Sequence, residues 1–175
     1  MRGQRARVSV RAHRPDLVRL ARWTSPLQST KPDSFGRPFL SALGGLAINR
    51  LGYVRATDDI DLLIAHDLAN RQRVKQALET LPDKAVRDLG EDDLAQWLVV
   101  RVNDEITVDL MTEACGVSFD GASHGIETVE IDGVPIPFAS AALMLKMKQG
   151  AREKDGLDRK FLERLVAEKK RAENS

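Results

Sequence analysis

The sequence predicts an α/β fold of the α+β kind, with one mixed β-sheet and helices packed on one face. Three observations predict it. Short segments alternate apolar and polar residues, as strands with one buried face do. Other segments carry apolar residues at helical spacing. The two kinds follow each other in the order strand, helix, strand, helix, hairpin, hairpin, helix.

Six segments are predicted to be strands: residues 39–43, 59–64, 94–102, 105–111, 127–131 and 134–138. The 59–64 segment has the clearest pattern, because its even-numbered residues are all apolar and are expected to face the core. Its odd-numbered residues, Asp59, Asp61 and Leu63, are expected to face the other way. Two tight hairpin turns are predicted, at Asn103-Asp104 and Asp132-Gly133.

Three regions are predicted to be helical: residues 46–51, 67–81 and 141–171. Gly52 and Pro82 follow the first two and end them. The third is expected to break into two helices near Gly150 or Gly156. Its apolar residues are predicted to pack on the domain; they are Leu157, Phe161 and Leu165, with Leu162 and Val166 beside them.

Length and composition limit the function classes. The 175 residues suffice for one domain, predicted at 38–175, after a basic arm and a linker at 1–37. A single cysteine, Cys115, excludes an internal disulfide and a cysteine-based zinc cluster, and three dispersed histidines argue against a histidine metal site. No apolar run approaches the ~20 residues of a membrane span, so we expect a cytoplasmic protein with no membrane partner.

The net charge of +1 conceals an asymmetry. Residues 23–145 carry nineteen acidic and ten basic side chains, whereas residues 1–22 and 146–171 are both basic. A protein that only coats nucleic acid is more often basic throughout. The pattern suits a site that holds cations and then phosphates, although the basic C-terminal stretch can also be read as a solvated helix face.

Three features combine into a candidate site. Gly44-Gly45 ends a strand and opens a helix, where backbone N–H groups can meet phosphate; an ordinary turn is the alternative. Asp59 and Asp61 share one strand face roughly 6–7 Å apart, which favours a divalent cation such as Mg²⁺ unless water solvates both. Asp109 has the parity of a non-core position. If its strand lies beside 59–64, three carboxylates converge and a two-metal site becomes plausible; otherwise Asp109 is a single solvated acid.

These residues resemble the polymerase-beta-like nucleotidyltransferase superfamily. The resemblance rests on LGG at 43–45, RATDDID at 55–61 and TVDL at 107–110. Within it, the R-x-T-x-D-I-D pattern is similar to the AbiEii-type branch, which includes toxins of toxin–antitoxin and phage-defence systems. The segment PFASAALMLKMKQGAREKDGLD at 137–158 resembles that branch's helix with a lysine, followed by K-D-x-x-D. The likeness covers roughly residues 38–166. Position 45 departs from the G-S variant of the pattern, because glycine offers no hydroxyl.

The resemblance implies a nucleotidyltransferase-like core followed by C-terminal helices. It also implies an enzyme, a transferase that moves a nucleoside monophosphate from a nucleoside triphosphate such as ATP to a hydroxyl acceptor. RNA, for example a tRNA, is the acceptor suggested, with a protein or small-molecule hydroxyl as alternatives, and a cognate antitoxin is an expected partner. The rival interpretation is a catalytically inactive nucleotide- or partner-binding module of the same fold.

The resemblance also assigns roles to residues. Asp59 and Asp61 would hold two Mg²⁺ ions, for which Mn²⁺ is an alternative. Asp109 would hold the catalytic metal and act as general base. Gly44 and Gly45 would cradle the triphosphate, and Lys146 would neutralise its charge.

The remaining roles have alternatives. Lys148 can substitute for Lys146. Asp155 and Asp158 would contribute to the site, or else bridge to Lys154 and Arg159 on the helix surface. Arg55 would reach phosphate or pair with Asp58, and Thr57 would orient its loop.

Overall fold

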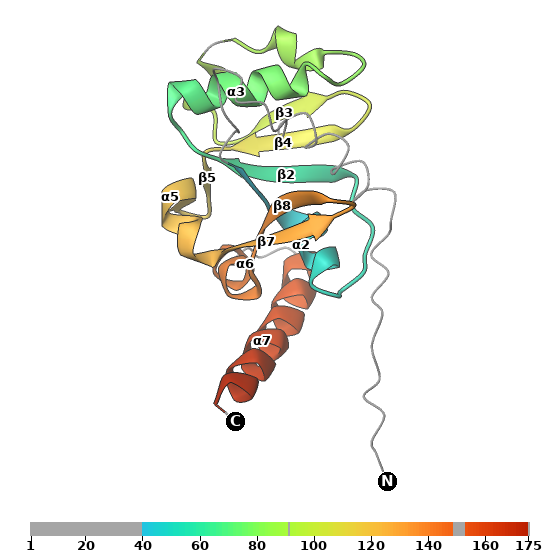
Figure 1. The fold of residues 1–175 in the computed structure, drawn as a ribbon, viewed down its shortest axis with the longest axis vertical. Helices are drawn as coiled ribbons and strands as arrows, with labels where there is room; N and C mark the ends of the chain where they lie inside the picture. Colours follow the sequence, from blue (N-terminus) through green and yellow to red (C-terminus); the bar gives the residue numbers. More distant parts are fainter. Residues whose placement is uncertain (1–39, 91, 149–152, 175) are drawn as a thin grey trace.

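A six-stranded mixed sheet forms the centre of the molecule (Figure 1). The structure, a computed structural model, describes residues 40–90, 92–148 and 153–174. The predicted arm and linker at 1–37, together with Phe39 and Gly150, lie outside these residues, as do the side chains of Leu40, Glu153 and Lys154. The predicted α+β class is confirmed.

The sheet is built from six of the eight described strands. These six are β1 (Leu40–Ala42), β2 (Asp59–Ile64), β3 (Val100–Asn103), β4 (Thr107–Met111), β7 (Ile126–Ile131) and β8 (Val134–Ala139). Their spatial order is β3-β4-β2-β1-β8-β7. Strands β2 and β4 are parallel, as are β1 and β8, and the other neighbours are antiparallel. A separate two-stranded ribbon pairs β5 (Glu113–Ala114) with β6 (Val117–Ser118).

Helices fill the connections. They are α2 (Gly44–Arg50), α3 (Leu68–Leu78), the 3₁₀ turn η2 (Ala85–Asp88), α4 (Asp93–Gln96), α5 (Phe119–Ala122), the 3₁₀ turn η3 (Ser123–Gly125), α6 (Ala141–Met147) and α7 (Glu153–Glu173). Helix α3 begins one residue after the predicted start, because Asp67 caps it: the Asp67 side chain accepts a hydrogen bond from the backbone N–H of Asn70. It ends at Leu78, three residues before the predicted end. No helix within the described residues is long and apolar enough to cross a membrane.

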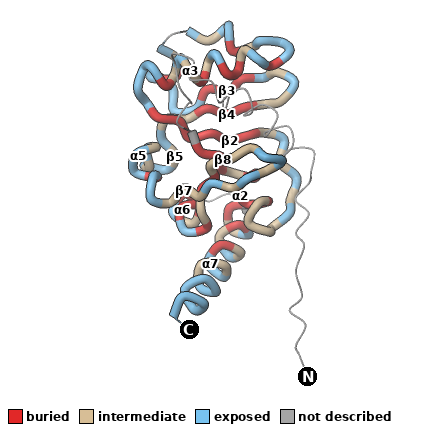
Figure 2. The backbone as a smooth tube through the Cα atoms, viewed as in Figure 1, coloured by how far each residue is buried: buried red, intermediate tan, exposed pale blue. Residues whose placement is uncertain are grey.

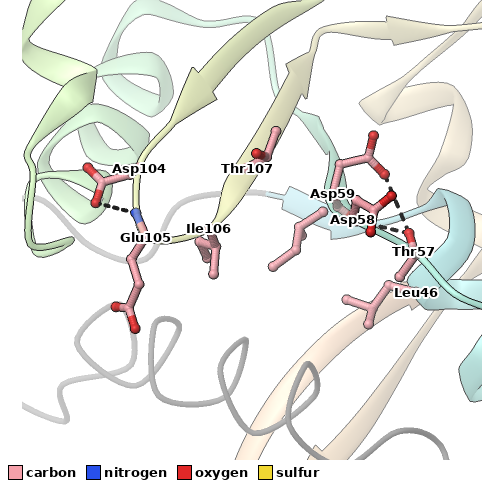
Figure 3. A pocket seen from close by; sticks show the side chains of 9 residues that line it. Leu46, Thr57, Asp58, Asp59, Asp104, Glu105, Ile106 and Thr107 are labelled. Atoms are coloured by element: carbon pink, nitrogen blue, oxygen red, sulfur yellow. Dashed lines mark hydrogen bonds between the residues drawn. The ribbon is translucent and has the colours of Figure 1, made fainter.

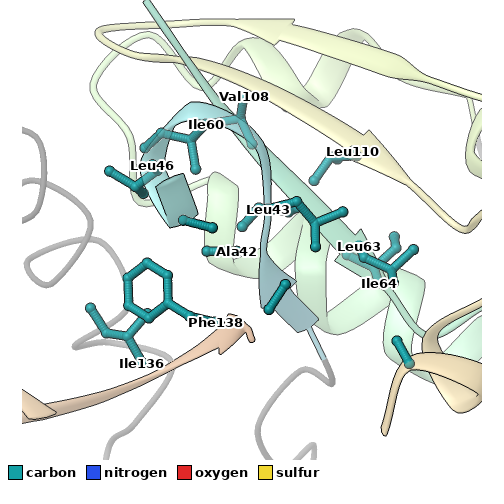
Figure 4. Packing of buried hydrophobic residues seen from close by; sticks show 14 of the residues in the cluster. Ala42, Leu43, Leu46, Ile60, Leu63, Ile64, Val108, Leu110, Ile136 and Phe138 are labelled. Carbon is teal, nitrogen blue, oxygen red and sulfur yellow. The ribbon is translucent and has the colours of Figure 1, made fainter. Parts of the chain in front are cut away.

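One face of the sheet forms the core. The register pairs Ile60 with Val108 and Leu62 with Leu110, so the apolar residues of β2 and β4 lie side by side. These four side chains are almost completely buried, and Figure 4 shows three of them among the residues that pack the core. The opposite face of the same two strands carries Asp59, Asp61 and Asp109. Alternation along two paired strands therefore separates the core from the acids.

Several predictions of secondary structure were wrong in detail. Residues 94–96 belong to the short helix α4 instead of a strand. The β3–β4 turn spans residues 104–106, since Asn103 pairs with Thr107, so it is one residue longer than the predicted two-residue turn. Helix α2 begins at Gly44, two residues before the predicted start. Leu63 is fully buried although it lies on the non-core face of β2, because β5 packs near this end of the strand.

The C-terminal helix also differs from the prediction. Gly156 lies inside α7, so the helix does not break there. Leu157 is 53% exposed, whereas Asp155, Asp158 and Leu162 are buried. The helix thus turns a stripe containing two carboxylates toward the domain, because basic partners on other elements meet them there. Figure 2 shows that its outer half is exposed.

Candidate functional site

The three predicted carboxylates lie on one face of the sheet. Asp61 of β2 is the register partner of Asp109 on the parallel strand β4, and Asp59 precedes Asp61 by two residues on the same face. All three line one cavity of about 770 Å³. Asp109 is 6% exposed, so the alternative of a solvated surface acid does not hold. We call Asp59, Asp61 and Asp109 the carboxylate face.

The cavity gathers most of the predicted site. Eight of the ten residues assigned from sequence line it: Gly44, Gly45, Arg55, Thr57, Asp59, Asp61, Asp109 and Asp155. The other two, Lys146 and Asp158, do not. Lys146 is exposed on α6, whereas Lys148 at the end of that helix lines the cavity. The structure therefore places the alternative lysine, and not the assigned one, beside the carboxylates.

The glycine turn fits closely against the carboxylate face. Gly44 has a φ of +57°, a conformation that disfavours side chains, and a Cβ added there would overlap the Asp61 carboxylate. A Cβ on Gly45 would overlap the Thr57 hydroxyl. The backbone N–H of Leu43 donates to the Asp61 carbonyl at 2.9 Å. Both glycines are thus required by the space that Asp61 and Thr57 occupy.

The loop before β2 is fixed by Asn49 of α2. The Asn49 amide donates to the Arg55 carbonyl and accepts from the Arg55 N–H, both at 2.8 Å. Asn49 is buried, so this pair anchors the loop to the helix that follows the glycine turn. Further along the loop, the Thr57 hydroxyl donates to the Asp59 carbonyl at 3.2 Å. This hydrogen bond links Thr57 to the first residue of β2.

Asp59 also borders a second, smaller cavity of about 160 Å³ (Figure 3). Asp104 and Glu105, in the β3–β4 turn, line its far side. The Asp104 carboxylate accepts from the backbone N–H groups of Asp83, Ala85 and Glu105 at 2.8–3.1 Å. Partial burial alone would raise the pKa of Asp104, but the three N–H donors together lower it below its ordinary value. Asp104 thus fixes the turn.

A second group of charges lies under the cavity. Arg55 donates to both oxygens of Asp158 at 3.2 and 3.1 Å, and Lys148 reaches Asp155 at 3.0 Å and Asp158 at 3.1 Å. The Asp158 side chain is completely buried. We call Arg55, Lys148, Asp155 and Asp158 the buried ion cluster. It joins the loop before β2 to α6 and α7. Of the two alternative partners expected on the helix surface, the side chain of Lys154 lies outside the described residues, whereas Arg55 and Lys148 are the basic partners that Asp158 has within them.

One residue that contacts the carboxylate face was not predicted. Arg101 of β3 is the antiparallel register partner of Asp109. Its guanidinium donates to the two oxygens of Asp109 at 2.7 and 2.6 Å and to Asp59 at 3.3 Å. The hydrogen bond and charge of Asp109, with smaller contributions from Asp59 and Asp61, raise the pKa of Arg101 above its ordinary value. Arg101 is thus the internal counter-ion of the carboxylate face.

The strand register explains why Arg101 was not predicted to contact Asp109. A two-residue turn at Asn103-Asp104 would have placed Leu98 opposite Asp109. The observed turn starts one residue later and is one residue longer, which together shift the pairing by three residues and bring Arg101 there. In the sequence, Arg101 is marked only as an arginine two residues before the turn signal, and Asn49 only as a polar residue in a helical segment.

The donor chemistry of the carboxylate face fits magnesium, which prefers hard carboxylate oxygens. The side chains are not arranged as a metal site in this structure. Within residues 40–90, 92–148 and 153–174, no three His, Cys, Asp or Glu side chains are placed to hold one metal ion. Both oxygens of Asp109 are instead engaged by Arg101. The face offers carboxylate oxygens, and Arg101 already engages both oxygens of Asp109 and one of Asp59.

Comparison with known proteins adds no assignment. No protein-family model matches the chain, and no curated protein sequence matches it.

Proposed function

We propose that this chain is a magnesium-dependent nucleotidyltransferase of the polymerase-beta-like type, and that it transfers a nucleoside monophosphate from a nucleoside triphosphate to a hydroxyl group on RNA. The observation that supports this most is the parallel β2–β4 register, which pairs Asp61 with Asp109 on the face that also carries Asp59. A glycine turn packs directly against Asp61. The cavity that these residues line has the volume of a typical small-molecule site.

In the proposed reaction, the acceptor hydroxyl attacks the α-phosphorus in line. A new bond forms between the acceptor oxygen and the α-phosphorus. The bond between the α-phosphorus and the oxygen that bridges it to the β-phosphate breaks, and pyrophosphate leaves with the electron pair. The Asp109 carboxylate takes the hydroxyl proton. Asp59, Asp61 and Asp109 would hold Mg²⁺, which supplies charge neutralisation and activation of the hydroxyl when bound.

The remaining residues bind and orient. Backbone N–H groups at Gly44 and Gly45 would bind the triphosphate, and Lys148, which also lines the cavity, would neutralise part of its charge. Thr57 orients Asp59 through its hydrogen bond to the Asp59 carbonyl. Arg55 pairs with the buried Asp158, so it supports the floor of the cavity.

The test is a transfer assay with each of the four α-labelled nucleoside triphosphates, Mg²⁺, and total cellular RNA and protein as acceptors. We expect label in an RNase-sensitive product, and a fall of at least about 10³-fold in Asp61→Asn. Asp132→Asn is the matched control, because Asp132 is exposed in the β7–β8 turn and asparagine tolerates its φ of +51°. Label transfer that persists in Asp61→Asn would rule out this site.

A second candidate, the inactive nucleotide- or partner-binding module, is favoured by the Arg101–Asp109 ion pair, which already neutralises an expected metal ligand. It predicts nucleotide binding without label transfer to any acceptor. A toxin role with a cognate antitoxin is a further part of the proposal. It predicts that expression of the wild-type chain stops bacterial growth and that expression of Asp61→Asn does not.

A further inference from the structure

Arg101 places a positive charge between two carboxylates of the carboxylate face, those of Asp109 and Asp59. Its guanidinium makes a bidentate contact with Asp109 and a third contact with Asp59. Bidentate arginine–carboxylate pairs are short, directional and stronger than neutral hydrogen bonds. In the structure, Arg101 therefore holds together two carboxylates that would otherwise repel each other.

The two partners differ in how freely they can move. The Asp109 side chain is 8% exposed and belongs to the interior strand β4, whereas the Arg101 side chain is 54% exposed and belongs to β3 at the edge of the sheet. A long, half-exposed side chain on an edge strand can rotate into solvent without disturbing the core. If the ion pair opens, Arg101 is the partner that leaves.

The contact also uses the groups that a metal ion would need. Both oxygens of Asp109 and one oxygen of Asp59 accept from the guanidinium. A divalent cation bound to the same oxygens would bring a second positive group to within a few ångströms of Arg101, and like charges at that range repel strongly in a partly enclosed cavity. The guanidinium and the cation are alternative occupants of the carboxylate face.

We propose that Arg101 is a positioning residue that takes the place of the divalent cation in the metal-free protein and is displaced when the cation binds. This inference rests on the proposed function, because it assumes that the carboxylate face binds a metal. Arg101 keeps Asp59 and Asp109 oriented before the cation arrives, and its displacement lowers the affinity for the cation alone. The negatively charged triphosphate restores that affinity, since it attracts both the cation and the released guanidinium.

The test measures binding of Mn²⁺ alone to the full chain, followed by the electron paramagnetic resonance signal of free Mn²⁺. Arg101→Gln removes the competing charge, and we expect it to bind Mn²⁺ at least about tenfold more tightly than the wild type. Arg101→Lys keeps the charge but loses the bidentate geometry, so its affinity should fall between the two. Arg87→Gln is the matched control, because Arg87 forms an exposed ion pair with Glu79 and lines neither cavity.

Added ATP provides a second readout. Because ATP itself binds Mn²⁺ in solution, this readout is the Mn²⁺ retained with the protein in equilibrium dialysis. ATP should increase the retained Mn²⁺ more in the wild type than in Arg101→Gln, which has no guanidinium to displace. If Arg101 had only a structural role, its replacement would destabilise the fold, but ATP would tighten Mn²⁺ binding equally in the wild type and in Arg101→Gln.

The outcomes separate the two proposals. Tighter Mn²⁺ binding by Arg101→Gln, abolished by adding Asp61→Asn, supports the inference. Equal or weaker binding by Arg101→Gln, still abolished by Asp61→Asn, overturns the inference and leaves the metal site of the proposed function intact. If neither the wild type nor Arg101→Gln binds Mn²⁺, with or without ATP, both the inference and the proposed metal site are wrong.

Discussion

The carboxylate face and the buried ion cluster are made of the same residue types but differ in burial. Both pair aspartates with basic side chains across elements that are distant in sequence. On the carboxylate face the cation, Arg101, is 54% exposed. In the buried ion cluster, Lys148 is 13% exposed and Asp158 is completely buried.

Burial decides what each set of charges can do. Removing one partner of a buried pair leaves a charge with no solvent to stabilise it, so such a pair cannot exchange partners without cost to folding. A pair whose cation reaches solvent can exchange it for another cation. The burial difference thus separates ion pairs that hold the cavity wall together from an ion pair whose cation can leave. Lys148 belongs to the first kind and also lines the cavity, so it can face a ligand while it keeps its carboxylate partners.

The largest expected effect comes from Asp158→Asn. It leaves Arg55 and Lys148 without their shared buried carboxylate, and we expect the free energy of unfolding to fall by about 3–5 kcal/mol, measured by urea denaturation. Glu168→Gln is the control on the same helix, because its ion pair with Arg164 is exposed on both sides. That variant should change stability by less than about 0.5 kcal/mol. Similar losses in the two variants would contradict the distinction drawn from burial.

The next largest effect is expected from Lys148, and it distinguishes this residue from Lys146. Lys148→Met removes a cation that contacts two buried carboxylates, and we expect a loss of about 2–3 kcal/mol in unfolding free energy, together with roughly tenfold weaker binding of ATP. Lys146→Met, on an exposed position of the same helix, should leave both quantities within experimental error. Equilibrium denaturation and titration calorimetry test the pair. Weaker ATP binding in Lys146→Met alone would restore the original assignment of Lys146.

Gly44→Ala tests the contact between the glycine turn and Asp61. Alanine at a φ of +57° is strained by about 1–2 kcal/mol, and its Cβ would force the Asp61 carboxylate to move. Gly133→Ala is a matched control, because Gly133 has a φ of +81° but open space around it. Both variants should lose stability, Gly44→Ala more than Gly133→Ala because of the overlap with Asp61, and only Gly44→Ala should weaken Mn²⁺ binding. Equal Mn²⁺ affinity in the two variants would show that Asp61 does not depend on the turn.

The smallest effect concerns the turn that sets the Arg101–Asp109 register. The pKa of Asp104 is lower in the folded protein than in the unfolded chain, so its carboxylate stabilises the fold above its ordinary pKa, and this contribution is lost as the pH falls through the folded-state value. Asp104→Asn should therefore cost about 0.5–1 kcal/mol at pH 7, because the group is largely open to solvent, and the difference from wild type should shrink below about pH 4. Urea denaturation at both pH values measures it.

The control for Asp104→Asn is Asp83→Asn. Asp83 contributes its backbone N–H to Asp104, and the substitution keeps that donor. A difference from wild type that is the same at pH 7 and at pH 3 in Asp104→Asn would show that the carboxylate charge does not stabilise the turn.

Much of the fold and of the site was predictable from local pattern. Alternation in 59–64 placed Ile60 and Leu62 in the core and Asp59 and Asp61 on the opposite face, because side-chain direction in a strand depends only on parity. The parity of Asp109 was predicted in the same way. The helix at Asp67 was predictable because its cap is encoded locally.

Other features depended on distant partners. Helical spacing in 157–166 suggested that Leu157 is buried, but the helix turns Asp155 and Asp158 inward because Arg55 and Lys148 meet them from other elements. The assignment of Lys146 rested on a resemblance, and only the packing of α6 shows that Lys148 faces the cavity.

The sequence alone determined which residues share a strand face, since that depends on chain geometry between near neighbours. Tertiary structure decided which faces meet and in what register: the pairing of β2 with β4, the one-residue longer β3–β4 turn, and the arrival of Arg101 opposite Asp109. The reason is that strand register depends on contacts summed over several elements, and a shift of one residue changes every cross-strand partner.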